Sequence, residues 1–209
     1  MSQDPMSPDN PMLLSGYSNV PPGMIATVVT CLQMLERPEP GSMPPAGSLT
    51  VEHWPSPSIE DYRALYRSVG EHWMWTSRLI IDDAELSAIL QDPLIEVHAL
   101  MDGDRAVGLL ELDFRKEGEC EIGYFGLAAG TIGKGAGRFL MNAAIEKAWS
   151  RRISRLWVHT CHLDSAQALP FYQRSGFKPF KMMVEVVDDV RLTGLVPRSA
   201  SPQAPIIEL

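Results

Sequence analysis

The most constraining feature of this sequence is a glycine-rich turn within residues 119–149. The segment before the turn, CEIGYFGL, is short, apolar and aromatic and predicts a buried strand, whereas FLMNAAIEKAW after it has helical spacing. Between them, residues 133–138 read GKGAGR, with a glycine at every second position. Such glycines let the backbone approach a bulky ligand, and a helix start offers unpaired N–H groups and a positive dipole end. The stretch therefore predicts a phosphate site.

Two known phosphate-binding motifs do not fit this spacing. A Walker loop needs Ser or Thr after Gly-Lys, and here Gly135 follows Lys134. A dinucleotide fingerprint needs G-x-G-x-x-G, but Gly133, Gly135 and Gly137 are two apart throughout. Close packing alone can also require a glycine-rich turn, so the turn by itself leaves both roles open.

Three consecutive segments add specificity. The phrase GKGAGRFLMNAAIEKAW, the strand RISRLWVHT and the segment LDSAQALPFYQRSGFK together resemble the acetyl-CoA-binding and closing motifs of the GCN5-related N-acetyltransferases. The resemblance extends over residues 97–180. It implies an acetyl-CoA-dependent N-acetyltransferase that transfers an acetyl group to a primary amine by direct attack in a ternary complex. A non-catalytic acyl-CoA-binding sensor or assembly module is the alternative.

The order of predicted strands and helices indicates the fold class. It is α/β (α+β), with a mixed, largely antiparallel central sheet and helices on both faces. One acetyltransferase-like domain is expected over 24–197, with its core motifs in 97–187. Residues 1–23 are predicted to be a flexible tail and 198–209 a C-terminal tail, because both are rich in Pro and Ser.

Three further strands are predicted outside these motifs. Residues 24–34 and 49–54 both suit a strand, and the sequence does not decide which of the two opens the sheet. A final short strand is expected at 192–196.

The resemblance implies which residues hold the cofactor. In the family, the strand before the glycine turn separates from its neighbour and the pantetheine arm fills the gap, so the contacts are mainly main-chain. The residues implied are Phe125, Gly126, Leu127, Gly133, Lys134, Gly135, Ala136, Gly137 and Arg138. One position departs from the family pattern, since Ile132 stands where Gln or Arg is usual. For Lys134 and Arg138, exposed charge at a helix start is the alternative to phosphate contact.

The resemblance also implies two residues that transfer protons. Tyr172 occupies the place of the family's tyrosine that protonates the leaving thiolate, and Glu121 aligns with the glutamate base of the histone-acetylating branch. A carboxylate within an apolar strand would be desolvated, which raises its pKa. Glu111, Asp113, His159 or an ordered water chain are the alternatives for the base.

The acceptor wall is implied by the same resemblance. In the family, the first two helices and the loop between them line the acceptor site. Helices are predicted over 59–69, with Ser58 as N-cap, and over 82–90. Trp73 and Trp75 lie between them and are implied to contact the acceptor, with burial in the core as the alternative.

The segment around His159 and His162 predicts no metal site. Neighbouring residues alternate in direction along a strand, and no second Cys/His cluster lies near. Asp164 and Ser165 predict an N-cap for the last helix, with a pantetheine contact as a second role.

Charge and cysteine content limit the partners. The formal net charge of −8 and the pI near 5.1 argue against nucleic-acid binding and favour a cationic acceptor, either a small amine or a protein amino group. Three cysteines suit reduced core thiols. No leader or long apolar run is present, so a cytoplasmic protein without a membrane segment is expected. A homodimer is possible, and the sequence does not decide the oligomeric state.

Overall fold

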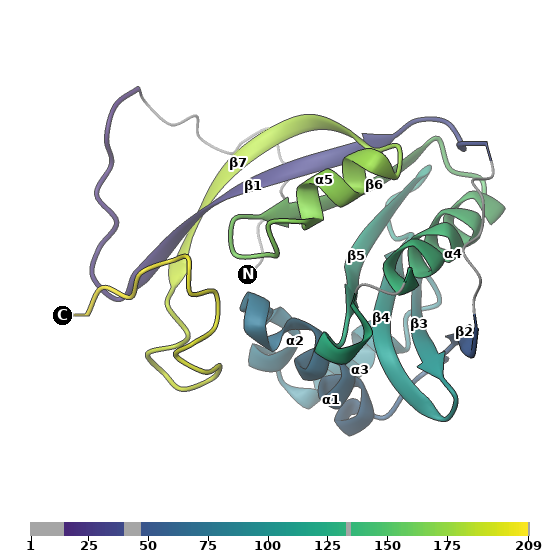
Figure 1. The fold of residues 1–209 in the computed structure, drawn as a ribbon, viewed down its shortest axis with the longest axis horizontal. Coiled ribbons are helices and arrows are strands. Elements are labelled where there is room, and N and C mark those ends of the chain that lie inside the picture. Colours follow the sequence, from purple (N-terminus) through teal and green to yellow (C-terminus); the bar gives the residue numbers. More distant parts are fainter. Residues whose placement is uncertain (1–14, 40–46, 133–134, 209) are drawn as a thin grey trace.

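The computed structural model describes residues 15–39, 47–132 and 135–208, and there the chain forms one seven-stranded sheet with helices on both faces (Figure 1). The strands are β1 (Met24–Met34), β2 (Leu49–His53), β3 (Ile95–Asp102), β4 (Arg105–Asp113), β5 (Glu119–Leu127), β6 (Arg155–Cys161) and β7 (Lys178–Asp188). The helices are α1 (Ile59–Gly70), η1 (Glu71–Trp73), α2 (Ser77–Ile80), α3 (Asp83–Leu90), η2 (Ala129–Thr131), α4 (Ala136–Ser150) and α5 (Ala168–Arg174).

The strand order is β2-β3-β4-β5-β6-β1-β7. Among these strands β5 and β6 form the parallel pair, and every other neighbouring pair is antiparallel. The predicted mixed, largely antiparallel sheet is thereby confirmed.

Both early strand predictions are confirmed, but the two strands lie far apart in the sheet. β2 is an edge strand beside β3, with Leu49 opposite Asp102. β1 is inserted between β6 and β7, so Cys31 lies opposite both His159 on β6 and Lys181 on β7. The first and last strands in the chain are therefore neighbours in the sheet.

The sheet separates two hydrophobic clusters. One lies on the side of α4 and α5 and includes Leu140, Ala144 and Ala148, the stripe that the helical spacing predicts. The other lies on the side of α1–α3 and includes Tyr62 and Tyr66. Because successive strand residues point to opposite faces, the central strands β3, β4 and β5 contribute to both clusters.

Two helices begin at side-chain caps. The hydroxyl of Ser58 accepts a hydrogen bond from the Asp61 N–H at 3.1 Å, as predicted for α1. The carboxylate of Asp82 accepts one from the Glu85 N–H at 2.8 Å at the start of α3. Each cap satisfies an N–H group that the helix itself leaves unpaired.

The segment after β7 packs on the domain. Arg191 is buried, forms an ion pair with Asp189 at 2.7 Å, and donates to the carbonyls of Ala200 at 3.1 Å and Ala204 at 2.9 Å. Ser201 is fully buried. This bonding fixes the backbone of the segment, in which Val196 and Ala200 are also buried.

These contacts bear on two expectations for the C-terminal end. The strand expected at 192–196 is wrong, because this part forms turns and bends around Arg191. In the predicted tail at 198–209, several residues before Glu208 are packed against the domain rather than detached from it. Residues 1–14 of the predicted N-terminal tail, and residue 209, lie outside the described residues.

Candidate active site

The parallel strands β5 and β6 separate partway along their length. They are paired from Glu119 opposite Arg155 to Ile122 opposite Val158. A bulge at Gly123 follows, and beyond it β5 continues to pair with β4. In the part of the chain that the structure describes, the other backbone edge of β5 from Gly123 to Leu127 has no strand partner. Phe125, Gly126 and Leu127, the residues that the resemblance assigns to pantetheine, lie on this part of β5.

The helix α4 begins beside the far end of this open edge. Gly135 precedes it with a φ of +82°, in the left-handed region that favours glycine, and provides no side-chain cap. The first intrahelical bond runs from the Phe139 N–H to the Gly135 carbonyl at 3.0 Å. The N–H groups of Ala136, Gly137 and Arg138 precede that bond and so have no partner within the helix. Gly133 and Lys134 lie outside the described residues.

Tyr172 is buried on the α4–α5 side of the sheet. Its ring lies 6.1 Å from the rings of both Phe125 and Phe177. Burial, and then the charge of Asp164, raises the pKa of Tyr172 well above its ordinary value. The phenol is therefore held in its protonated form.

Glu121 and His159 form a pair on the opposite face. Cys120 and Ile122 point into the α4-side cluster, so Glu121 between them points to the α1–α3 side. The distance from Glu121 Oε1 to His159 Nδ1 is 3.3 Å. His159 is the first residue of β6 beyond the paired part, so the pair lies where the gap opens.

The environment of this pair differs from the sequence expectation. The side chain of Glu121 is 25% exposed and that of His159 is 41% exposed, so Glu121 is not enclosed by apolar residues. Desolvation alone would lower the pKa of His159, but the hydrogen bond to Glu121 and the charges of Glu121, Asp164 and Glu185 outweigh it and raise that pKa. A histidine whose Nδ1–H donates to Glu121 presents its Nε2 lone pair as a proton acceptor.

The other two candidate bases are bound elsewhere. Glu111 is fully buried, with one oxygen 2.5 Å from Arg78 Nη2 and the other accepting from the Tyr62 hydroxyl at 2.6 Å. Asp113 is bound to Arg115 at 2.5 Å. Both carboxylates therefore already balance a cation.

Trp75 packs against the open strand. Its ring lies 5.7 Å from Tyr66 and 5.3 Å from Tyr124. A Cβ added to Gly126 would lie 2.4 Å from Val69 and 3.1 Å from Trp75, so packing on this face requires glycine there. Trp75 thus belongs to the edge of the α1–α3 cluster, next to the predicted pantetheine strand. Trp73 is half-buried in η1, two residues away.

Asp164 connects the two sides of the gap. It lies in the loop after β6, and its carboxylate accepts hydrogen bonds from Trp75 Nε1 at 3.3 Å, the Thr160 hydroxyl at 2.7 Å and the Cys161 N–H at 3.0 Å. The N-cap role predicted for Asp164 is therefore wrong, since the cap position of α5 is Gln167 and it makes no side-chain cap bond. The pattern of residues alone gives no sign of this contact, because Trp75 is 89 positions away.

The C-terminal segment makes a second connection at the same place. Ser201 donates its N–H to the His72 carbonyl at 3.0 Å and its hydroxyl to the Leu163 carbonyl at 3.0 Å. His72 precedes the tryptophans and Leu163 precedes Asp164. Residues 72–75 and 163–164 are thus held together both directly and through Ser201, a role that no motif or spacing in the sequence indicates.

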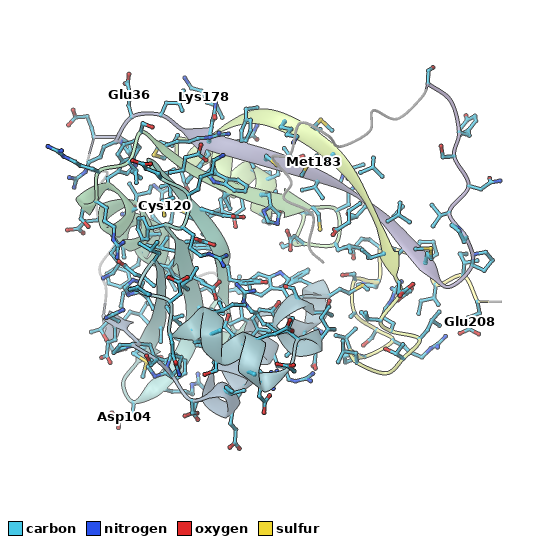
Figure 2. The ribbon with its side chains drawn as sticks, turned by 180° about the vertical axis from the view of Figure 1, so that it is seen from behind. Glu36, Asp104, Cys120, Lys178, Met183 and Glu208 are labelled. Carbon is cyan, nitrogen blue, oxygen red and sulfur yellow. The ribbon has the colours of Figure 1, made fainter. Side chains whose placement is uncertain are left out.

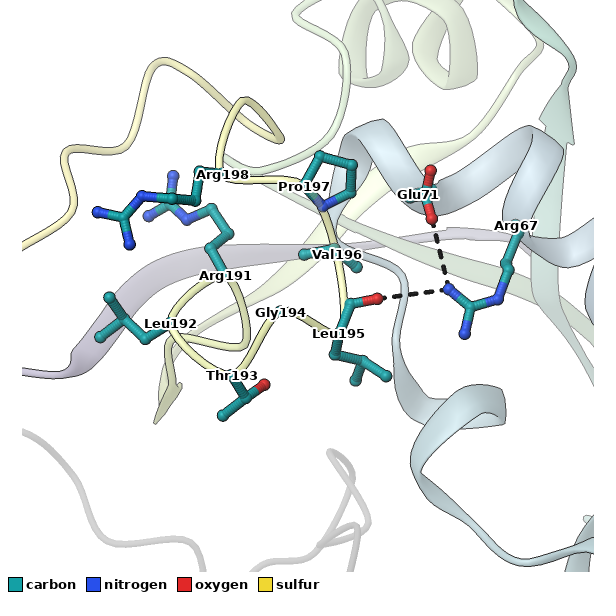
Figure 3. A pocket seen from close by; sticks show the side chains of 10 residues that line it. All are labelled: Arg67, Glu71, Arg191, Leu192, Thr193, Gly194, Leu195, Val196, Pro197 and Arg198. Carbon is teal, nitrogen blue, oxygen red and sulfur yellow. Dashed lines mark hydrogen bonds and ion pairs between the residues drawn. The ribbon is translucent and has the colours of Figure 1, made fainter.

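A surface hollow of about 750 Å³ lies between the end of α1 and residues 191–198 (Figure 3). Arg67 Nη1 contacts Glu71 at 3.4 Å and the Leu195 carbonyl at 3.3 Å. None of the residues implied for cofactor, catalysis or acceptor lines this hollow, so it is separate from the gap between β5 and β6.

The described residues also bear on two other kinds of site, a metal centre and a membrane span. Among the described residues, no group of three or more His, Cys, Asp and Glu is arranged to hold a metal ion. No helix formed by those residues has the length and apolar content to cross a membrane.

A model of the acetyltransferase (GNAT) family matches residues 52–177. This match spans more than half of the chain, and the protein belongs to the GNAT family. A search among curated proteins found no match.

Solved structures show the same fold. A GCN5-related N-acetyltransferase from Sphaerobacter thermophilus aligns with a TM-score of 0.57 at 16% identity over 88% of this chain and 54% of that one. An IAA acetyltransferase from Bacillus cereus aligns with a TM-score of 0.50 at 23% identity over 64% of this chain and 79% of that one. An aminoglycoside acetyltransferase from an uncultured soil metagenomic sample aligns with a TM-score of 0.51 at 18% identity over 62% and 88%. This chain therefore spans about half the length of the Sphaerobacter protein.

Proposed function

We propose that this protein is an N-acetyltransferase that uses acetyl-CoA and acetylates a primary amine by direct attack in a ternary complex. The observation that carries the proposal is the gap between β5 and β6, with Tyr172 on one face of the sheet and the Glu121–His159 pair on the other. A thioester held in the gap would have a proton donor on one side and a proton acceptor on the other.

The residues at the gap suit acetyl-CoA. The open edge at Phe125–Leu127 offers main-chain groups to the pantetheine, and the uncapped start of α4 offers N–H groups to the pyrophosphate. An added Cβ at Gly137 would lie 3.7 Å from Leu127 and Phe171, an ordinary contact, so packing within the protein does not require glycine there. A close ligand explains it. When bound, acetyl-CoA supplies the activated acetyl group.

The proposed proton transfers use one group on each face of the sheet. An alkylammonium with a pKa of about 10.4 loses its proton at neutral pH at a cost of roughly 4 to 5 kcal/mol. The Glu121–His159 pair receives that proton, directly or through water. The free amine then forms the new N–C bond as the C–S bond breaks, and Tyr172 donates its proton to the departing sulfur. The second proton that the nitrogen loses as the amide forms passes through water and restores the Tyr172 hydroxyl.

The acceptor site follows from the residues that connect the two sides of the gap. Trp75 and Asp164 lie there, with Trp73 nearby, and we assign them to acceptor binding. The carboxylates of Glu121, Asp164 and Glu185 all act on His159 electrostatically, which favours a cationic amine. With a net charge of −8, nucleic acid is not an expected partner. We place the protein in the cytoplasm because its three cysteines are free thiols.

A sensor that binds acyl-CoA without turnover is the second candidate, and Ile132 in place of the usual Gln or Arg favours it. Two measurements separate the candidates. Acetyl-CoA should raise the melting temperature, since a hundredfold excess over Kd adds about 2.7 kcal/mol of stability. Release of free coenzyme A with a panel of amines should then require an amine. A melting shift without amine-dependent release would identify the sensor.

The binding site is tested by Gly135→Asp. This change adds a negative charge and a Cβ at a left-handed position, so the melting shift with acetyl-CoA should disappear. Gly103→Asp is the matched control, because Gly103 has a φ of +59° in the β3–β4 turn. It should lower stability while keeping the full acetyl-CoA shift. Equal loss of the shift in both variants would contradict the assignment.

A further inference from the structure

The outer edge of β7 is exposed and apolar. β7 is the last strand of the sheet and, among the described residues, pairs with β1 alone. Met182 is 69% exposed, Val184 46% and Val186 45%. Figure 2 shows Met183 on this outer strand. A long, apolar edge strand pairs readily with another strand unless it is covered.

The direction of the main-chain groups along this edge follows from one hydrogen bond. The Asp189 N–H donates to the Gly23 carbonyl at 2.9 Å, so the main-chain groups of residue 189 point toward β1. Direction alternates along an antiparallel strand, so residues 181, 183, 185 and 187 also face β1. The N–H and C=O groups of Met182, Val184 and Val186 therefore face outward.

The side chains of β7 make the strand complementary to itself. If two copies pair antiparallel with Met183 at the two-fold axis, Met182 lies opposite the partner's Val184, and their outward main-chain groups form hydrogen bonds. In the same register Lys181 lies opposite the partner's Glu185, and Glu185 opposite the partner's Lys181. A shift of the register by one residue would remove this pairing of opposite charges.

We propose that this protein forms a two-fold symmetric dimer by antiparallel pairing of β7 with β7 of a second copy, in the register centred on Met183. Opposite charges directly across an antiparallel pair stabilise it and like charges destabilise it. The interface is isologous, so each change in charge acts twice. The two sheets become one continuous sheet of fourteen strands, since each copy contributes the seven described.

Exchanging the charges of Lys181 and Glu185 tests the proposed register of the β7–β7 pair. The wild-type mass, measured by light scattering during gel filtration over a range of concentrations, should be that of a dimer. Lys181→Glu places a second carboxylate opposite the partner's Glu185, and Glu185→Lys places two ammonium groups opposite each other, so each variant alone should be a monomer. An equimolar mixture of the two should recover the dimer mass, because every pair across the interface is then of opposite charge.

The recovery in the mixture also shows that each variant is folded. Arg152→Glu makes the same change of charge at an exposed position after α4 and should leave the dimer intact. A wild-type monomer at all concentrations would overturn the proposal. So would a dimer that both variants retain, or two monomeric variants that do not associate when mixed. Acetyl transfer is measured independently, so its presence or absence does not decide this outcome.

Discussion

The two faces of the sheet at the gap between β5 and β6 differ in their access to solvent. On the α4–α5 side, Tyr172 is enclosed by the rings of Phe125 and Phe177, and burial holds it protonated. On the α1–α3 side, Glu121 and His159 are partly exposed and paired with each other. Tyr172, the proposed proton donor to the departing sulfur, is thus sealed from water. The Glu121–His159 pair, the proposed proton acceptor, is open to water.

The largest effect on catalysis is expected from a change to Tyr172, on the buried face. Tyr172→Phe removes the hydroxyl and keeps the ring packing, so kcat should fall by about 100- to 10,000-fold at every pH while acetyl-CoA still raises the melting temperature. Steady-state kinetics across pH and a thermal shift measure the two properties. A wild-type kcat in this variant would remove Tyr172 as the acid.

A smaller, pH-dependent effect on the rate is expected from a change to Glu121, on the solvent-exposed face. His159 accepts a proton only when neutral, so the rate should rise as pH rises through its pKa, which Glu121 helps to raise. Glu121→Gln removes that carboxylate. The midpoint of the rise should move to lower pH, and the plateau should fall by about 10- to 100-fold. The profile of kcat/KM against pH shows both changes.

Asp113→Asn is the matched control for that change. Asp113 lies opposite Glu121 on β4 but is bound to Arg115, so the pH profile should match that of the wild type. If Asp113→Asn moved the profile and Glu121→Gln did not, the base would have to be reassigned.

Loss of the Trp75–Asp164 hydrogen bond, which spans the gap, should weaken binding of the acceptor amine alone. Trp75→Phe keeps an aromatic ring against Tyr66 and Tyr124 but loses the hydrogen bond to Asp164, which is worth about 0.5–1.5 kcal/mol. The KM of the amine should rise by up to about tenfold, with the KM of acetyl-CoA unchanged. An equal rise in both, together with a lower melting temperature, would assign Trp75 to the core only.

The smallest effect is expected away from the gap. Ser58→Ala removes the cap of α1 and should lower the free energy of unfolding by about 1 kcal/mol. Because α1 keeps its buried face, kcat and both KM values should not change. Denaturant unfolding and kinetics would show this separation, and a loss of activity here would mean that the acceptor wall depends on the start of α1.

Much of the local structure follows from the sequence. The strand and helix on either side of the glycine turn, the cap at Ser58 and the stripe of Leu140, Ala144 and Ala148 all depend on residues within a few positions of one another. Spacing and capping chemistry act over that range, so a short window contains the information. The role predicted for Tyr172 came from the resemblance of its segment to a known family.

The tertiary structure alone decided which distant groups meet. The Glu121–His159 pair, the Trp75–Asp164 bond and the position of β1 between β6 and β7 join residues 38 to more than 100 positions apart. Spacing does not encode such partners, because they are selected by the burial of both clusters and by the register of the whole sheet. The sequence by itself therefore determined the elements and the family. The folded chain determined that Tyr172 is buried, that the Glu121–His159 pair is partly exposed, and that the C-terminal segment binds residues 72 and 163 through Ser201.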